Sequence, residues 1–193
     1  MKIAVVDDSK FTRMVIKQIL NDLSNTDFCW EAENGKVALE KNTLDPVDLI
    51  ISDLEMPVLD GLQLLKTVIG GEAETKCLLI SAFHKSNQPK IIDALKAGAI
   101  GFIEKNSLGK GFDINSLKKE IDKYINFLFQ DNILKKEIRS ISLEKNLNKS
   151  VINNRADIIS IIGSAGSLGP IEKILEFTSK LEVPIVIGIH IPL

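Results

Sequence analysis

Short runs of apolar, often β-branched residues alternate with longer amphipathic stretches over the first 105 residues, and this alternation limits the possible folds more than any other feature. The expected strands span residues 3–6, 28–32, 47–52, 77–81 and 101–104. Helical patterns separate them, at about 9–23, after Asn34-Gly35, near 61–69 and near 89–97. Apolar strands that alternate with helices predict a parallel sheet covered on both faces. We therefore expect an α/β domain with a doubly wound, five-stranded parallel sheet.

Composition excludes several classes of protein. The chain has 193 residues and a formal net charge of −2, which gives no support for a nucleic-acid partner. No apolar run approaches the roughly 20 residues that a membrane span needs, and acidic residues follow the N-terminus too soon for a signal peptide. Cys29 and Cys77 both lie in strand-like runs and are expected to be core residues. We expect a reduced cytoplasmic protein without membrane insertion.

Polar side chains stand directly after four of the expected strands. Asp7 and Asp8 follow the first strand, Asp53 the third, Ser81 the fourth and Lys105 the fifth. Ligands of doubly wound sheets bind at the carboxyl ends of the strands, so these residues should share one rim. Converging carboxylates repel each other unless a hard cation lies among them, and Mg²⁺ prefers such oxygen ligands. A lysine and a hydroxyl on the same rim can hold the oxygens of a phosphoryl group carried by one carboxylate.

Four motifs between residues 5 and 105 carry a family resemblance. VVDDS, ISDLEMPVLDG, ISA and GFIEK occur in that order, and over residues 1–125 the chain resembles the receiver domain of two-component response regulators, which has a flavodoxin-like fold. The resemblance implies that Asp53 accepts a phosphoryl group from a sensor histidine kinase. It also implies that Asp8, Asp53 and the backbone carbonyl of Glu55 bind Mg²⁺, with Asp7 acting through water.

The same resemblance implies roles for three further residues. Ser81 and Lys105 would contact the phosphoryl oxygens, and Phe102 matches the aromatic position that moves on activation. The chain departs from the family at Asn106, where a proline in a cis bond is usual. A cis bond before a residue other than proline costs about 2.5–4 kcal/mol.

Residues 106–156 carry no comparable chemistry. Apolar residues recur there at three- and four-residue steps and predict one helix face: Ile114, Leu117, Ile121, Ile125 and Leu128. We interpret this stretch as the last receiver helix, extended into a linker. A coiled-coil dimer is the alternative, although regular heptads persist only briefly. The polar segment SLEKNLNKSVINNR marks a boundary, so we predict a receiver domain at 1–125, a linker at 126–154 and a third unit at 155–193.

The third unit reads as one βαβ unit of an incomplete α/β domain. DIISIIG is the first strand, SAGSLG the turn, PIEKILEFTSKL the helix, and VPIVIGIHIP a second strand that ends at His190. Gly163, Gly166 and Gly169 would also suit a dinucleotide loop, but an acidic residue is then expected at the end of the second strand, where His190 stands. A plain structural turn is a further alternative.

A serine and a histidine at neighbouring strand ends can meet, so that the histidine takes the serine proton. The stretches IIGSAGSLGPIEKIL and IGIHIP resemble the catalytic domain of chemotaxis response regulator protein-glutamate methylesterases, which carries G-A-S-[TA]-G-G and Q-H-M-P segments. Aligning the helix puts Ser164 at the nucleophile and His190 at the base. One residue before the serine is missing, Ser167 replaces a glycine and Ile189 replaces the glutamine. Shifting the gap would put Ala165 at the nucleophile instead.

The family's third catalytic residue, a downstream aspartate, is not among the 193 residues, and neither is most of its sheet. A histidine without its orienting carboxylate loses about 10⁴ in rate in serine proteases, so we expect negligible esterase activity from this chain alone. Two functions remain open. In one, phosphorylation of Asp53 relieves inhibition of an attached esterase that acts on methylated chemoreceptors. In the other, the chain is a non-enzymatic phospho-switch whose C-terminal segment docks a partner protein.

Overall fold

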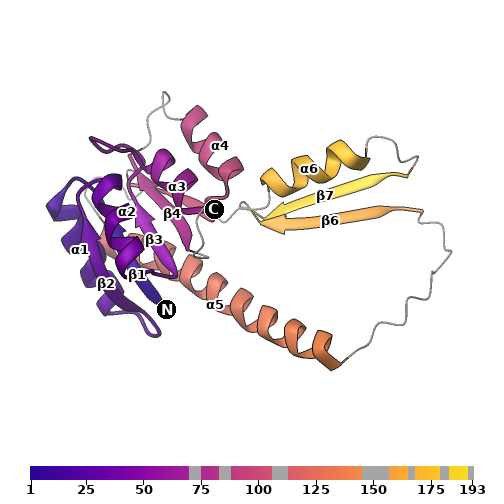
Figure 1. Ribbon diagram of the computed structural model, residues 1–193, viewed down its shortest axis with the longest axis horizontal. Coiled ribbons are helices and arrows are strands. Elements are labelled where there is room, and N and C mark those ends of the chain that lie inside the picture. Colours follow the sequence, from indigo (N-terminus) through magenta and orange to yellow (C-terminus); the bar gives the residue numbers. More distant parts are fainter. Residues whose placement is uncertain are drawn as a thin grey trace.

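The computed structural model describes residues 1–69, 75–82, 88–105, 113–144, 157–164, 168–178 and 183–190. Five parallel strands form the main sheet in the order β2-β1-β3-β4-β5 (Figure 1). The order confirms the predicted doubly wound α/β fold. The strands are β1 (Lys2–Val6), β2 (Asp27–Ala32), β3 (Leu49–Ser52), β4 (Lys76–Ser81) and β5 (Gly101–Glu104).

Helices cover both faces of this sheet. Alternate residues of β1 show how: Ile3 and Val5 join the core under two helices, whereas Ala4 and Val6 join the core on the opposite face. The first face is covered by α1 (Lys10–Asn21) and α5 (Ile114–Glu144). The second face is covered by α2 (Gly35–Leu44), α3 (Gly61–Ile69) and α4 (Gln88–Ala97).

Local hydrogen bonds fix where these elements begin. The Ser9 side chain accepts the Thr12 N–H and caps α1, and Asn34 caps α2 in the same way through the Val37 N–H. Strand β3 starts two residues later than predicted, and the Val47 N–H before it donates to the Asn42 side chain at 3.2 Å. The caps matter for function, since Ser9 ends the turn that carries the first two aspartates.

The last helix of the main domain, α5, is a single element of 31 residues. Leu117, Ile121, Ile125 and Leu128 are buried against the sheet, as the apolar spacing predicts. Tyr124, which the prediction did not include, is buried with them, and Ile114, which was predicted on the same face, is exposed. The helix runs through residue 125 into the segment predicted as a linker. Residues 145–156 lie outside the described part of the chain, so the domain boundaries stay a prediction.

A separate two-stranded parallel sheet follows. It consists of β6 (Ile159–Ser164) and β7 (Ile185–His190), with α6 (Leu168–Thr178) between them in the chain. Helix α6 lies beside α4 (Figure 1), and Lys96 Nζ on α4 pairs with Glu172 Oε1 on α6 at 2.9 Å. Ile171 of α6 is buried. The predicted βαβ unit therefore packs on the main domain through its helix. Among the described residues, no helix is long and apolar enough to cross a membrane.

Candidate functional site

Three carboxylates gather at the carboxyl ends of β1 and β3. These two strands are neighbours, and the chain leaves them for opposite faces of the sheet, which opens a crevice between the two loops. The Asp53 N–H donates to the Val6 carbonyl at 2.8 Å, so Asp53 continues the register of β3 against β1. Carboxylate oxygens of Asp7, Asp8 and Asp53 lie within 4.8 Å of one another. Asp7 and Asp53 are buried, with 1% and 8% exposed, whereas Asp8 is exposed.

Lys105 brings a positive charge to the two buried carboxylates. Its Nζ donates to Asp7 Oδ2 at 2.8 Å and to Asp53 Oδ2 at 2.6 Å, and 17% of its side chain is exposed. Burial raises the pKa of Asp7, and the ion pair with Lys105 offsets part of that rise. Burial acts to lower the pKa of Lys105, but its bonds to Asp53 and Asp7 outweigh burial and raise that pKa. Lys105 is therefore protonated at neutral pH.

Ser81 and Phe102 lie on the two strands beyond β3. Ser81 ends β4, is buried, and pairs in register with Glu104, while its carbonyl accepts the Lys105 N–H at 2.9 Å. Phe102 is half-buried on β5 and packs against the core cluster that includes residues of α4. The structure thus places Ser81 at the same edge of the sheet as Lys105, and Phe102 on β5 against the core cluster of α4.

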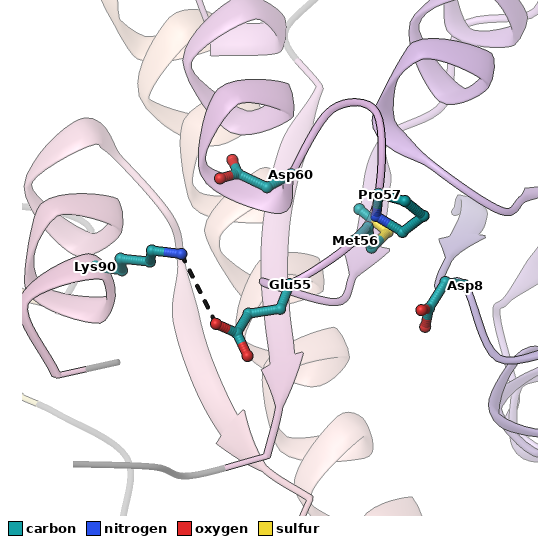
Figure 2. A pocket seen from close by; sticks show the side chains of 6 residues that line it. All are labelled: Asp8, Glu55, Met56, Pro57, Asp60 and Lys90. Carbon is teal, nitrogen blue, oxygen red and sulfur yellow. Dashed lines mark ion pairs between the residues drawn. The ribbon is translucent and has the colours of Figure 1, made fainter. Parts of the chain in front are cut away.

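A cleft of about 340 Å³ opens beside Asp8. Figure 2 shows its lining, in which Glu55 comes from the loop after β3 and Lys90 from α4. Lys90 Nζ lies 3.7 Å from Glu55 Oε1, and both side chains are about half exposed. The Glu55 N–H approaches Asp53 Oδ1 at 3.3 Å, so the cleft adjoins the carboxylate cluster. The remaining lining residues are Met56, Pro57 and Asp60.

Close packing holds the loop between Asp53 and α3. The Gly61 N–H donates to the Leu54 carbonyl at 3.0 Å, and a Cβ on Gly61 would lie 2.1 Å from the Asp53 carbonyl oxygen. Glycine is therefore required where the loop returns to the sheet. Val58, at the outer end of the loop, has a φ of +69° and an exposed side chain.

The model of the response regulator receiver domain family matches residues 3–122. The chain belongs to this family. Its receiver domain is similar to the crystal structure of the response regulator domain of CheB from Thermotoga maritima, with a TM-score of 0.58 and 31% identity over 65% of this chain and 93% of that one. The predicted resemblance to receiver domains is confirmed.

Similarity to known proteins continues beyond the receiver domain. A protein-glutamate methylesterase/protein-glutamine glutaminase from Syntrophomonas wolfei is 27% identical over 99% of this chain and 55% of its own length. A protein of the same name from Oceanobacillus iheyensis is 30% identical over 97% of this chain and 55% of its own length. The chain thus spans about half the length of these curated relatives. The similarity extends past the receiver domain into the βαβ unit, as the second predicted resemblance requires.

Beyond the receiver domain, the two predicted esterase residues end neighbouring strands. Ser164 is the last residue of β6 and His190 the last of β7, and their Cα atoms are partners in the parallel register. The side chains of both residues lie outside the described part of the chain, as do residues 165–167 of the predicted serine turn and Asn106 after Lys105. The catalytic roles of Ser164 and His190 therefore stay predictions.

Sequence reasoning missed Arg13 and Lys90. Arg13, on the first turn of α1, donates from its guanidinium to the carbonyl of Asp7 at 2.7 Å. Lys90 lines the cleft from α4. Both are cations on amphipathic helices, where most charges face solvent. The spacing of six residues between Asp7 and Arg13 was a usable signal, because a side chain on the first helical turn leans back over the preceding turn.

Proposed function

We propose that this chain is a phosphorylation-dependent response regulator that accepts a phosphoryl group on Asp53 from a sensor histidine kinase. The observation that carries the proposal is the Asp53 carboxylate, buried in the crevice against the Lys105 ammonium and beside two further carboxylates. Asp7 is a poorer acceptor, because its side chain is more deeply buried than that of Asp53, with 1% of Asp7 exposed against 8% of Asp53.

The donor set at the crevice fits Mg²⁺. Three carboxylates with oxygens within 4.8 Å form a hard, anionic set of ligands, which is what this cation prefers. We infer that Asp8, Asp53 and the Glu55 carbonyl bind it directly and that Asp7 acts through water. Bound Mg²⁺ would supply positive charge that offsets the repulsion between these carboxylates and an incoming phosphoryl group.

The chain's own residues then perform the transfer. A carboxylate oxygen of Asp53 attacks the phosphorus, a new O–P bond forms, and the bond from phosphorus to the donor's nitrogen breaks, so that the donor histidine keeps the electron pair. Lys105 and Ser81 hydrogen-bond to the phosphoryl oxygens. Because bonding to Asp53 and Asp7 raises the pKa of Lys105, the side chain meets the incoming phosphoryl group as an ammonium.

We further infer that phosphorylation regulates an attached methylesterase that removes methyl esters from chemoreceptor glutamates. Support comes from the similarity to methylesterases over 97% or more of the chain. The packing of α6, which follows Ser164, against α4 of the receiver domain gives a physical route. Phe102 packs against the core of α4, so a change at the crevice can reach the α4–α6 contact.

Labelling with phosphate tests the acceptor. The chain should incorporate label from acetyl phosphate or from an autophosphorylated histidine kinase when Mg²⁺ is present. Asp53→Asn should abolish the label, whereas Asp93→Asn, at an exposed aspartate on α4, should keep it. Undiminished labelling of Asp53→Asn would refute the assignment. For the esterase, we expect no measurable hydrolysis of receptor methyl esters by this chain, and a rate that Ser164→Ala removes would contradict that expectation.

A further inference from the structure

We propose that Arg13 is a positioning residue for the Mg²⁺ site: it holds the backbone of the turn that carries Asp7 and Asp8, and so sets their carboxylates for binding the cation. This inference rests on the proposed function, because it concerns the same cation. It assigns a task to a side chain that contributes no ligand atom of its own.

Arg13 contacts the main chain of both aspartates. One terminal nitrogen of its guanidinium, Nη1, donates to the Asp7 carbonyl at 2.7 Å and lies 3.4 Å from the Asp8 carbonyl. Its side chain is 12% exposed, so these bonds form largely away from water. A buried carbonyl without a partner costs free energy, and a charged donor is among the strongest partners available.

The turn needs such a donor because of how it lies between two regular elements. The Asp7 N–H continues the ladder with β2 through the Ala32 carbonyl, and the first helical bond runs from the Arg13 N–H to the Ser9 carbonyl. The carbonyls of Asp7 and Asp8 fall between these two ladders. Arg13 lies on the first turn of α1, and its side chain leans back toward the Asp7–Asp8 turn, where it donates to these carbonyls.

Glu31 on β2 fixes the guanidinium in turn. Arg13 Nε donates to Glu31 Oε1 at 3.3 Å, while the Glu31 carbonyl accepts from Lys41 Nζ at 2.7 Å. The planar guanidinium can therefore donate through Nε to β2 and through Nη1 to the turn at the same time. A lysine has no such fork, so it can replace the charge but not both bonds.

Whether Mg²⁺ binds more weakly or more tightly without Arg13 distinguishes a positioning role from the effect of its charge alone. Arg13 is a cation close to the carboxylate cluster, so its field alone repels Mg²⁺, and its removal would strengthen binding. Loss of positioning weakens binding instead, as removal of partners outside the ligand shell of metal sites does, typically by about 10–100-fold. We therefore expect Arg13→Ala to weaken Mg²⁺ binding by at least about tenfold.

The experiment measures Mg²⁺ dissociation constants of the full 193-residue chain by calorimetry, checked by competition against Mn²⁺ detected by electron paramagnetic resonance. Arg13→Lys should bind with intermediate affinity, and Glu31→Gln should lose less than about fivefold, since its ion pair is partly exposed. Lys17→Ala removes the same charge one turn later on α1, at an exposed position, and should not weaken binding. At saturating Mg²⁺, Arg13→Ala should regain the wild-type rate of labelling by acetyl phosphate.

Unchanged or tighter binding by Arg13→Ala would overturn the inference while leaving the proposed function intact. If Arg13→Ala does not fold, Arg13→Lys decides, and wild-type affinity in that variant would overturn the inference equally. A wild-type chain that binds no Mg²⁺ would refute the proposed cation site itself and this inference with it.

Discussion

Replacing Lys105 by methionine removes an ammonium from a buried carboxylate cluster while keeping most of the apolar stem. Nζ of Lys105 contacts Asp7 at 2.8 Å and Asp53 at 2.6 Å, and Asp8 adds a third carboxylate within 4.8 Å. In the Lys105→Met variant, two nearly buried carboxylates lose this counter-ion. The variant should therefore be less stable than the wild type whenever divalent cations are absent.

The magnitude follows from burial. Removing one partner of a buried ion pair costs about 3–5 kcal/mol, and the 17% exposure of Lys105 places this case near the lower end, at about 3 kcal/mol. With a urea slope of about 2 kcal/mol per molar, the unfolding midpoint should fall by about 1.5 M. Saturating Mg²⁺ should raise the free energy of unfolding of the variant by more than that of the wild type, because in the variant no ammonium competes with the cation for the carboxylates.

The loss should also depend on pH. Burial raises the pKa of Asp7 above its ordinary 3.8, and removal of Lys105 takes away an interaction that lowers it. An acid with a raised pKa in the folded state binds its proton more tightly there, so stability falls as the pH rises from below 3.8 through the raised pKa. The difference between variant and wild type should thus be largest at neutral pH and shrink in acid.

Urea unfolding followed by tryptophan fluorescence measures all three effects. Trp30 is the single tryptophan; it is 8% exposed on β2, and its indole N–H donates to the Asp45 carbonyl at 3.0 Å. Lys118→Met is the matched control, because the Lys118–Asp22 pair is more exposed, at 35% and 57% of the two side chains, and should be worth less than about 1 kcal/mol. Equal losses in the two variants, or a loss at Lys105 that Mg²⁺ does not reduce, would refute the reasoning.

Two further predictions concern close packing in the main domain. Gly61→Ala would put a methyl group 2.1 Å from the Asp53 carbonyl oxygen, so it should cost about 1–3 kcal/mol in urea unfolding and slow the labelling of Asp53. Gly188→Ala is its control, with no atom within 4 Å, and an equal loss there would contradict the steric argument. Burial raises the pKa of Cys77 to about 12, so the thiol should react with Ellman's reagent only on unfolding, after the half-buried Cys29. Reaction of both thiols at one rate in the folded chain would show that Cys77 is not protected.

The pattern of strands in the sequence predicted most of the fold and most of the candidate site. Because a parallel sheet brings the ends of its strands to one edge, residues that follow strands could be assigned to a common rim before any contact was known. Asp7, Asp8, Asp53 and Lys105 do meet there. The strand pattern does not predict the directions in which helix side chains point. The position of Arg13 over the turn, and the docking of α6 on α4 through Lys96, depend on charges that look like solvated helix residues in the sequence.

The C-terminal unit shows the same limit in a different form. Its strands were predictable from their apolar runs, and the register that pairs Ser164 with His190 follows from a parallel ladder. The departures from the methylesterase pattern around Ser167 and Ile189 concern side chains and a turn, which strand pairing does not determine. Backbone topology can therefore bring the two residues to one edge without deciding their chemistry.

The contacts of Lys105 also determine the charge balance of the crevice. Three carboxylates against one ammonium leave these four side chains with a formal charge of −2, which one divalent cation cancels. A phosphoryl group on Asp53 would replace one negative charge by about two, leaving the occupied crevice with a charge of about −1. The cation is then held more tightly by the phosphorylated chain. By linkage, the cation would favour the phosphorylated state to the same extent, so the Mg²⁺ concentration would shift the equilibrium between the phosphorylated and unphosphorylated chain.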